Sequence, residues 1–375
     1  MNSRERIRTI LNRQEPDRVG FQDTDFFSDT LERWHGEGLP RSVDVLRPNW
    51  PWLNVPGLRY FGHDIYVTWP DISLKYDAID YEVADNWSIA KDEFGTTKKS
   101  WTGKTASPQF LDPVVKTPQD FEGRVEPLLD HLDIRRVSSA GYPFRQELEQ
   151  MVKRFQREFF VTVGVVGPWE YSTYLCGGLA ATLVFVMKNQ DFASSMFMRI
   201  ADFLAKICES YIAAGADGLW VFDDQGSQDG PFFSPRLYER LLEPAHEKVC
   251  APFVRRDLPR LLHSDGHIEP LIPHFIDAGF LALHPVQNKA GMDVKKLKER
   301  YGDELALIGG MDTRILSSGD LDAIRNEVRS KIGVAAKGGG YIAASDGPVP
   351  PTISLDSYKF FVEAVKKYGA YPIRD

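Results

Sequence analysis

The chain has 375 residues, of which 43% are hydrophobic and 26% charged, and its formal net charge is -8 at pH 7. This composition can form a large buried core, and the negative charge argues against nucleic acid or an anionic membrane surface as the main partner. No run of about 18 uncharged apolar residues is present, so no membrane span is expected. The three cysteines, Cys176, Cys208 and Cys250, lack metal-type spacing, which fits a cytoplasmic protein.

The first third of the chain predicts an elaboration before a regular repeat. Residues 1–18 favour an amphipathic helix and lack the apolar centre of a secretion signal. Residues 19–22 predict a strand, and a second strand is expected between residues 50 and 75. Residues 70–115 are polar, rich in Thr, Trp and Tyr, and broken by turns. They predict an antiparallel insertion near the mouth of the main fold.

From residue 160 onward, short apolar runs alternate with helical patterns. Strands are expected at residues 159–166, 219–222, 261–262, 280–283, 305–308 and 341–344. Helices are expected at residues 191–215 with Asp191 as N-cap, 235–254 after Ser234, and near 268–278, 293–301, 320–336 and 354–368.

This alternation predicts an α/β fold, a (β/α)₈ TIM barrel formed as one domain by residues 1–375. The alternative is an open doubly wound sheet. That fold would require a glycine-rich phosphate loop after the first strand, and Gln22-Asp23-Thr24-Asp25 is not such a loop.

Acidic and imidazole side chains follow the predicted strands. In a barrel, residues just past the strand ends meet at one face, so we expect these groups to converge. Clustered carboxylates are costly unless a metal or cationic ligand neutralises them, or some are protonated. The residues are Asp23, Asp25, Glu170, Asp223, Asp224, Asp265, Asp312 and Asp346, with His263 and His284.

A divalent metal site is the sharpest hypothesis from these residues. His263, Asp265 and Asp346 supply one imidazole and two carboxylates, a set that suits Zn²⁺, Mn²⁺ or Mg²⁺. Glu170 or Asp224 could be a fourth ligand. The sequence equally allows Asp265 to cap a helix near residue 268.

Other residues are predicted to take part in catalysis or substrate binding. Glu170, Asp224 and Asp23 are predicted catalytic groups, and Glu170 stands between two aromatic residues, where a carboxylate is poorly solvated. Asp223 or Asp224 is also expected to accept hydrogen bonds from loop amides, Asp312 to cap a short turn, and His284 could be a core histidine. The predicted substrate-binding residues are Trp169, Tyr171, Asp223, Gln225 and His284.

Several motifs resemble the uroporphyrinogen decarboxylase superfamily, including its cobalamin-dependent methyltransferase branch. The resemblance covers nearly the whole chain, is weakest over residues 25–130, and implies a barrel with a deep cleft at the carboxyl ends of its strands. The motifs are Ser3-Arg4-Glu5-Arg6 with Glu15-Pro16-Asp17-Arg18-Val19, Gly167-Pro168-Trp169, residues 217–224, Phe233-Ser234-Pro235, Glu243-Pro244, His263-Ser264-Asp265-Gly266, residues 305–312 and residues 338–342.

The chain departs from both branches of that superfamily. The resemblance implies that a porphyrinogen decarboxylase binds its polyanionic substrate through arginines after the first strand, and residues 21–27 contain none. It also implies that the methyltransferases hold zinc with His-x-Cys and a later Cys. Here His263, Asp265 and Asp346 occupy those positions. Carboxylates in place of thiolates give a harder metal, which suits polarising an oxygen or nitrogen of a substrate.

Three functions follow. The first is metal-assisted methyl transfer, the demethylation of a small methylated or methoxylated compound, with a corrinoid carried only by a partner protein. The second is a metal-free decarboxylase or lyase in which Asp23 or Asp224 holds a cationic or pyrrole-like intermediate. The third is a non-catalytic barrel that binds a ligand or a corrinoid protein. The sequence predicts no oligomeric state.

Overall fold

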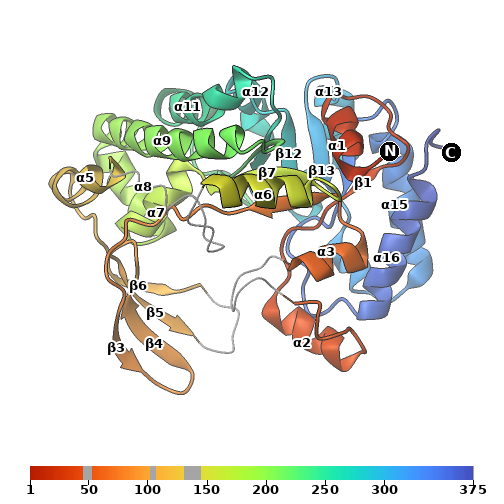
Figure 1. Cartoon of the computed structure of the whole chain (residues 1–375), viewed down its shortest axis with the longest axis horizontal. Coiled ribbons are helices and arrows are strands. Elements are labelled where there is room, and N and C mark those ends of the chain that lie inside the picture. The colour runs from red at the N-terminus through yellow and green to blue at the C-terminus, as the bar shows by residue number, and fades with distance from the viewer. Residues whose placement is uncertain (45–52, 102–106, 131–144, 375) are drawn as a thin grey trace.

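Eight parallel strands form the central sheet of the computed structural model, which describes residues 1–44, 53–101, 107–130 and 145–374. From the second strand onward each strand pairs with the next one of the sheet, and the last strand pairs with the first (Figure 1). This order is that of a (β/α)₈ barrel, which confirms the predicted fold and excludes the alternative of a doubly wound sheet. The strands are β1 (Gly20–Phe21), β2 (Ile65–Thr68), β7 (Phe160–Val166), β8 (Gly218–Phe222), β11 (Arg260–His263), β12 (Ala282–Val286), β13 (Ala306–Gly309) and β14 (Tyr341–Ala343).

Hydrogen bonds between β1 and β2 complete the ring. The backbone N–H of Asp64 donates to the carbonyl of Phe21 at 2.9 Å, and the N–H of Phe21 donates to the Asp64 carboxylate at 2.9 Å. The N–H of Ile65 donates to the side-chain oxygen of Gln22 at 2.8 Å. Side chains therefore replace part of a regular strand ladder at this seam.

Alternate side chains of each strand belong to two different hydrophobic cores. Ile65, Phe160, Trp220 and Ile308 belong to the barrel interior, where the apolar face of helix α1 (Ser3–Leu11) also packs. Their neighbours along the strands face the surrounding helices and join the larger core. Successive side chains of a strand point to opposite faces, and both faces are buried here, so the strands are almost continuously apolar.

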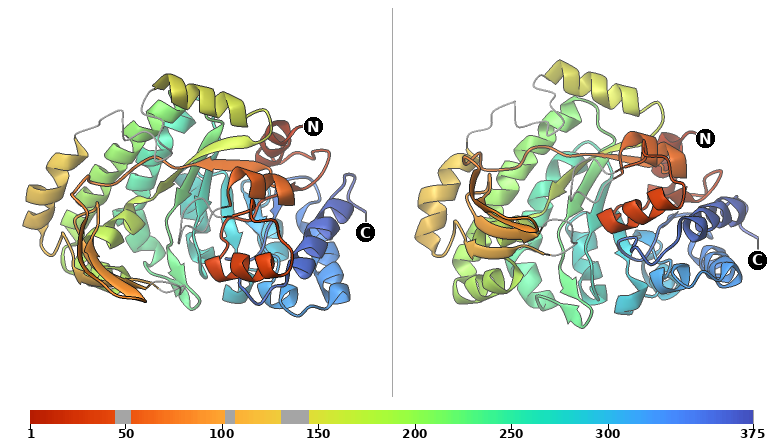
Figure 2. Two further views of the ribbon diagram at one scale, coloured as in Figure 1. Left: turned by 60° about the horizontal axis from the view of Figure 1, so that its bottom comes forward. Right: turned by 90° about the horizontal axis from the view of Figure 1, so that it is seen from below.

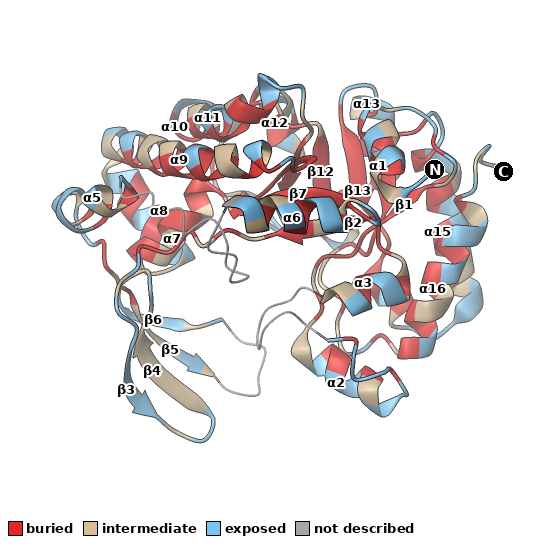
Figure 3. Ribbon diagram, in the orientation of Figure 1, coloured by how far each residue is buried: buried red, intermediate tan, exposed pale blue. Residues whose placement is uncertain are grey.

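Helices cover the outside of the barrel, with their buried faces turned toward it in Figure 3. The helix predicted from residue 191 begins at Gln190, so Asp191 does not cap it. The helix predicted over 235–254 is two helices that separate at Leu242. The helices that follow residue 144 include α6 (Arg145–Phe155), α9 (Gln190–Ala213), α10 (Pro235–Leu241), α11 (Glu243–Val254), α12 (Ile272–Asp277), α13 (Val294–Tyr301), α15 (Leu321–Ala335) and α16 (Leu355–Tyr368).

Further helical segments and a hairpin lie along the described chain. The helical segments are α2 (Ser28–Gly36), α3 (Val55–Phe61), α4 (Pro118–Asp120), η1 (Phe121–Val125), α5 (Glu126–Leu129), η3 (Glu269–Leu271), η4 (Asn288–Ala290) and α14 (Thr313–Leu316), and a small hairpin pairs β9 (Gly226–Ser227) with β10 (Gly230–Pro231). No helix of the described residues is long and apolar enough to cross a membrane.

The predicted insertion is confirmed as a four-stranded antiparallel sheet. It runs in the order β3 (Ile79–Val83), β4 (Trp87–Lys91), β5 (Thr97–Trp101) and β6 (Gln109–Asp112). Figures 1 and 2 show it as a separate layer beside the barrel, next to helices α7 (Pro168–Cys176) and α8 (Leu179–Lys188). Phe94 packs edge-on against Tyr171 and Tyr174, and the hydroxyl of Thr96 donates to the Tyr174 carbonyl at 2.9 Å.

Candidate active site

Three neighbouring strands bring the acidic and imidazole groups together. Phe222, His263 and His284 are register partners on β8, β11 and β12, so the residues that follow them emerge side by side. Asp224, His263 and Asp265 each offer a ligand atom, and these atoms all lie within 4.8 Å of one another. The Nε2 atom of His263 lies 3.5 Å from an Asp224 oxygen.

A second histidine holds the ring of His263. The Nδ1 atoms of His263 and His284 are 2.7 Å apart, and the Nε2 atom of His284 lies 3.4 Å from the Thr24 hydroxyl. Burial and the nearby His263 lower the pKa of His284 well below its usual value, so His284 is neutral. A hydrogen bond that uses Nδ1 of His263 leaves Nε2 to face the carboxylates, as a metal-binding imidazole requires.

The carboxylates around His263 resist ionisation. Burial raises the pKa of Asp265 to about 7, and repulsion by Asp224 and Asp25 adds to this, while His263 opposes it. Burial likewise raises the pKa of Asp25 to about 6, with His263 opposing and Asp224 adding to the shift. Carboxyl groups with raised pKa values are either protonated or stabilised as anions by a nearby cation.

Glu170 lies in the first turn of α7. Its N–H donates to Asp223 at 2.6 Å, and the Tyr174 hydroxyl donates to its carboxylate at 3.3 Å. Burial raises the pKa of Glu170 well above the usual range, and the charges of Asp224 and Asp223 raise it further. A carboxyl in this state can donate a proton near neutral pH.

The structure does not bring Asp346 into this group. It is fully buried, and its carboxylate accepts hydrogen bonds from the Thr313 N–H at 3.0 Å, the Thr313 hydroxyl at 2.8 Å and the Lys289 N–H at 3.1 Å. Among the described residues, Asp224 takes the third place beside His263 and Asp265 instead. Asp346 holds the loops that follow β12 and β13.

The carboxylate of Asp23, like that of Asp346, is held by hydrogen bonds from neighbouring segments. Its carboxylate accepts hydrogen bonds from the Ser345 N–H at 2.6 Å, the Ser345 hydroxyl at 2.7 Å and the Tyr358 hydroxyl at 2.5 Å. These bonds tie the end of β1 to the end of β14 and to α16. The geometry favours a structural role for Asp23 over the predicted catalytic one.

The predicted substrate-binding residues lie mostly behind the cluster. Trp169 is 1% exposed and packs edge-on against Phe233, and the Tyr171 hydroxyl donates to the carbonyl of Ile72 at 2.8 Å. The side-chain amide of Gln225 donates to the Asp223 carbonyl at 3.1 Å, while its buried oxygen has no partner among the described residues. Of this set, His284 contacts the ring of His263, and Asp223 contacts the backbone of Glu170.

The hydrogen bonds predicted for Asp223 or Asp224 and for Asp312 are confirmed, while the helix cap considered for Asp265 is absent. Asp223 accepts from the N–H groups of Trp169 and Glu170, and Asp224 accepts from the N–H of Asp265 at 2.8 Å. Asp312 caps α14 through the N–H of Arg314. Asp265 caps no helix, because η3 begins after Ile268 without a side-chain cap.

Two features were missed from the sequence. Asp25 was noted at a strand end but not assigned a role. A buried chain also runs from the Tyr238 hydroxyl to His246 Nδ1 at 2.6 Å and from His246 Nε2 to Asp223 at 2.7 Å. His246 lies within α11, two residues after the Glu243-Pro244 motif, and its partners Tyr238 and Asp223 come from other elements, so the local sequence could not predict this contact.

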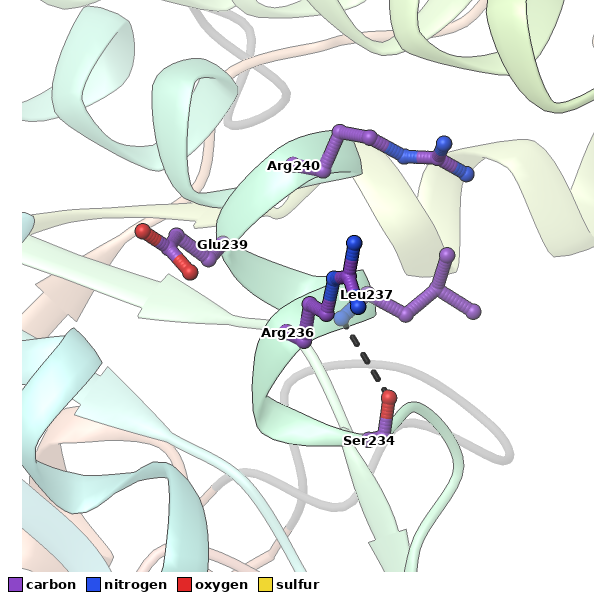
Figure 4. Close-up of a pocket in the computed structure, with 5 residues that line it drawn as sticks. All are labelled: Ser234, Arg236, Leu237, Glu239 and Arg240. Atoms are coloured by element: carbon purple, nitrogen blue, oxygen red, sulfur yellow. Dashed lines mark hydrogen bonds between the residues drawn. The ribbon is translucent and has the colours of Figure 1, made fainter.

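A surface hollow of about 590 Å³ lies along α10, lined by Ser234, Arg236, Leu237, Glu239 and Arg240 (Figure 4). Ser234 caps the helix by accepting from the Leu237 N–H at 3.3 Å. None of the acidic cluster lines this hollow.

Comparison with known proteins decides the family. The model of the uroporphyrinogen decarboxylase (URO-D) family matches residues 89–368. The chain belongs to this family. It is 25% identical over 273 residues to a uroporphyrinogen decarboxylase of Pseudomonas putida, covering 68% of this chain and 70% of the relative. It is also 25% identical to one of Actinobacillus succinogenes, covering 60% of this chain and 64% of the relative.

A solved structure, a methyltransferase from Methanosarcina mazei, has a TM-score of 0.67 to this chain. The two chains are 18% identical, and the match covers 98% of this chain and 99% of the other. At that identity the likeness supports the fold, which both chains share from end to end. The family and the fold together indicate an enzyme of this superfamily whose architecture resembles that of the Methanosarcina mazei protein.

Proposed function

We propose that this URO-D family member is a metal-assisted enzyme that removes a methyl group from a small methylated or methoxylated substrate. The observation that carries the proposal is the group formed by Asp224, His263 and Asp265, whose ligand atoms lie within 4.8 Å of one another. One imidazole and two carboxylates form a donor set for Zn²⁺, with Mn²⁺ or Mg²⁺ as alternatives. The raised pKa values of Asp265 and Asp25 supply the electrostatic reason for a cation there.

Asp224, His263 and Asp265 would hold the ion. His284 orients His263 so that Nε2 faces the two carboxylates. A bound divalent ion supplies Lewis acidity that polarises an oxygen or nitrogen of the substrate.

Glu170 is the proton donor in this proposal. Its pKa is raised by burial and by Asp224 and Asp223, so it carries a proton that can pass from its carboxyl oxygen to a leaving oxygen or nitrogen. Tyr174 donates to that carboxyl and fixes its direction. Asp223 anchors the backbone of the same turn through the Glu170 N–H. The methyl group would pass to a corrinoid carried by a partner protein.

Metal-free decarboxylation is the second candidate, because the curated relatives named above are uroporphyrinogen decarboxylases. Asp224 or Asp25 would then hold a cationic or pyrrole-like intermediate, since the Asp23 oxygens are occupied. Turnover of a carboxylated substrate with a strong chelator present would favour this candidate.

Metal analysis of the purified protein tests the main proposal. We expect near-stoichiometric divalent metal in the wild type and loss of most of it in His263→Ala and Asp224→Asn. Asp346→Asn is the matched control, because it alters a buried carboxylate outside the group and should retain metal. Absence of metal from the wild type, even after addition of Zn²⁺, would reject the proposal. Equal loss in Asp346→Asn would reject this choice of ligands.

A further inference from the structure

Helix α7, which carries Glu170, is capped at its amino-terminal end by a carboxylate from another part of the chain. Its N-cap residue is Gly167, which has no side chain to supply a cap. Asp223, just after β8, accepts hydrogen bonds from the N–H groups of Trp169 at 3.3 Å and Glu170 at 2.6 Å instead. A Cβ atom on Gly167 would lie only 2.3 Å from the Cγ atom of Asp223. The glycine therefore leaves the space that the Asp223 carboxylate occupies as the cap of this helix.

The same contact region joins the proposed proton donor to a proposed metal ligand. The Glu170 carboxylate accepts a hydrogen bond from the N–H of Asp224, while the Glu170 N–H donates to Asp223. The first turn of α7 and the loop after β8 are thus connected in both directions. A displacement of Asp223 would change the position of Glu170 relative to Asp224.

His246 on α11 holds the Asp223 carboxylate from the other side. Its Nε2 atom lies 2.7 Å from Oδ2 of Asp223, and its Nδ1 atom lies 2.6 Å from the Tyr238 hydroxyl. All three side chains are fully buried. Water therefore does not compete for these hydrogen bonds, and each donor needs its partner within the protein.

The Tyr238 hydroxyl selects the tautomer of His246. Burial raises the pKa of Tyr238 well above its usual value, so the hydroxyl keeps its proton. Within the part of the chain that the structure describes, this hydroxyl bonds only to Nδ1 of His246, so its proton points to that nitrogen. Nδ1 then accepts, and the ring proton lies on Nε2, from which it is donated to Asp223.

We propose that Tyr238 and His246 are positioning residues of the active site, which act through Asp223 to fix Glu170 relative to Asp224. Tyr238 sets the tautomer, His246 supplies the donor, and the Asp223 carboxylate holds the first turn of α7. The importance of this chain for chemistry rests on the function proposed above for Glu170 and Asp224. Its effect on the backbone can be measured without metal or substrate.

Hydrogen exchange of the metal-free full chain, followed by NMR, tests the positioning. His246→Leu should speed exchange of the Trp169 and Glu170 amides at least about tenfold relative to the amides of β13, because a hydrogen bond to a charged group is lost. His246→Gln should restore slow exchange, since the glutamine amide supplies an N–H near the place of Nε2. Equal acceleration throughout the barrel, or no acceleration in His246→Leu, would overturn the proposal.

His274→Leu is the matched control. It removes a comparable histidine–carboxylate contact, from His274 to Glu243 at 2.6 Å, that does not involve α7. The Trp169 and Glu170 amides should exchange in this variant as they do in the wild type. Selective acceleration of these two amides in His274→Leu would contradict the assignment to His246.

A double variant tests the role of Tyr238. Tyr238→Phe should speed exchange of the Glu170 amide in the wild type but not in the His246→Gln background, because the glutamine amide donates whether or not the tyrosine is present. The same acceleration in both backgrounds would show that Tyr238 acts by packing alone. In the ¹⁵N spectrum, the imidazole signals absent from His246→Gln should show a proton on Nε2 and none on Nδ1. A proton on Nδ1 would overturn the proposed tautomer.

Zinc affinity separates a failure of this proposal from a failure of the proposed function. His246→Leu should weaken Zn²⁺ binding by about tenfold, the lower end of the effect of residues behind a metal ligand, and His246→Gln should restore it. A wild type that binds no Zn²⁺ would reject the proposed function, while the exchange rates would still decide whether His246 positions α7. Unchanged Zn²⁺ affinity in His246→Leu would overturn the connection between this chain and Asp224.

Discussion

The Nδ1 atoms of His263 and His284 lie 2.7 Å apart, although 21 residues separate them in the chain. His284 stays neutral because burial lowers its pKa. One ring therefore fixes the tautomer and the direction of the other. The candidate metal group depends on this contact as much as on its own three residues.

Replacing His284 with Phe should weaken Zn²⁺ binding by about 10- to 100-fold while the three ligands remain, because the orienting contact is lost. Competition against a chromophoric chelator measures this. His267→Phe is the control, since His267 bonds to the Ala290 carbonyl outside the group, and it should bind Zn²⁺ as the wild type does. Unchanged affinity in His284→Phe would contradict the orienting role.

Asp265→Asn should stabilise the metal-free protein at pH 8. The folded pKa of Asp265, about 7, lies above its unfolded value, so its favourable contribution is present at low pH and is lost as the pH rises through 7. We expect the variant to gain about 2 to 3 kcal/mol at pH 8 relative to pH 5, measured by urea unfolding with chelator. Asp346→Asn should lose stability at both pH values, because Asp346 accepts three hydrogen bonds. If the free energy of unfolding changes equally between pH 5 and pH 8 in the wild type and in Asp265→Asn, the raised pKa of Asp265 is refuted.

His63→Phe should protect the protein from acid. His63 is buried beside Phe21, Phe26 and Phe61, and burial lowers its pKa to about 3, with the charge of Lys366 adding to the shift. Below about pH 6.5, His63 is protonated in the unfolded state but stays neutral in the folded state. The free energy of unfolding therefore falls as the pH drops toward about 3.

We expect the wild type to lose about 2 kcal/mol more than His63→Phe between pH 8 and pH 5. Urea unfolding at both pH values measures the difference, and the pH 8 value of each protein is its own reference. Parallel losses in the two proteins would show that His63 does not resist protonation.

Asp64→Asn should destabilise the fold by about 3 kcal/mol, because it leaves buried arginine donors without their charged partner. The Asp64 carboxylate accepts hydrogen bonds from Arg6 at 2.8 Å and Arg18 at 2.9 Å, and from the Phe21 N–H that closes the barrel seam. Asp17→Asn is the control at an exposed partner of Arg6 and should cost about 1 kcal/mol or less. Chemical unfolding measures the loss of unfolding free energy in each variant. A larger loss in Asp17→Asn than in Asp64→Asn would contradict the role of Asp64 at the seam.

The sequence by itself determined the order of the elements. Apolar runs such as residues 160–166 and 219–222 predict strands, and helix signals such as Ser234-Pro235 mark helix starts, because both depend on neighbours a few residues away. The short strand at residues 65–68 could only be expected within a wide range, since four residues carry little periodicity. Strand order then placed the acidic loops on one face.

Only the tertiary structure decided which of those acids act together. Asp346 and Asp224 both follow strands and look alike in sequence, yet Asp346 is held by Thr313 and Lys289 while Asp224 faces His263. The physical reason is that a carboxylate bonds to whichever donors the folded loops present. Those donors come from residues far away in the chain, so no local pattern records them.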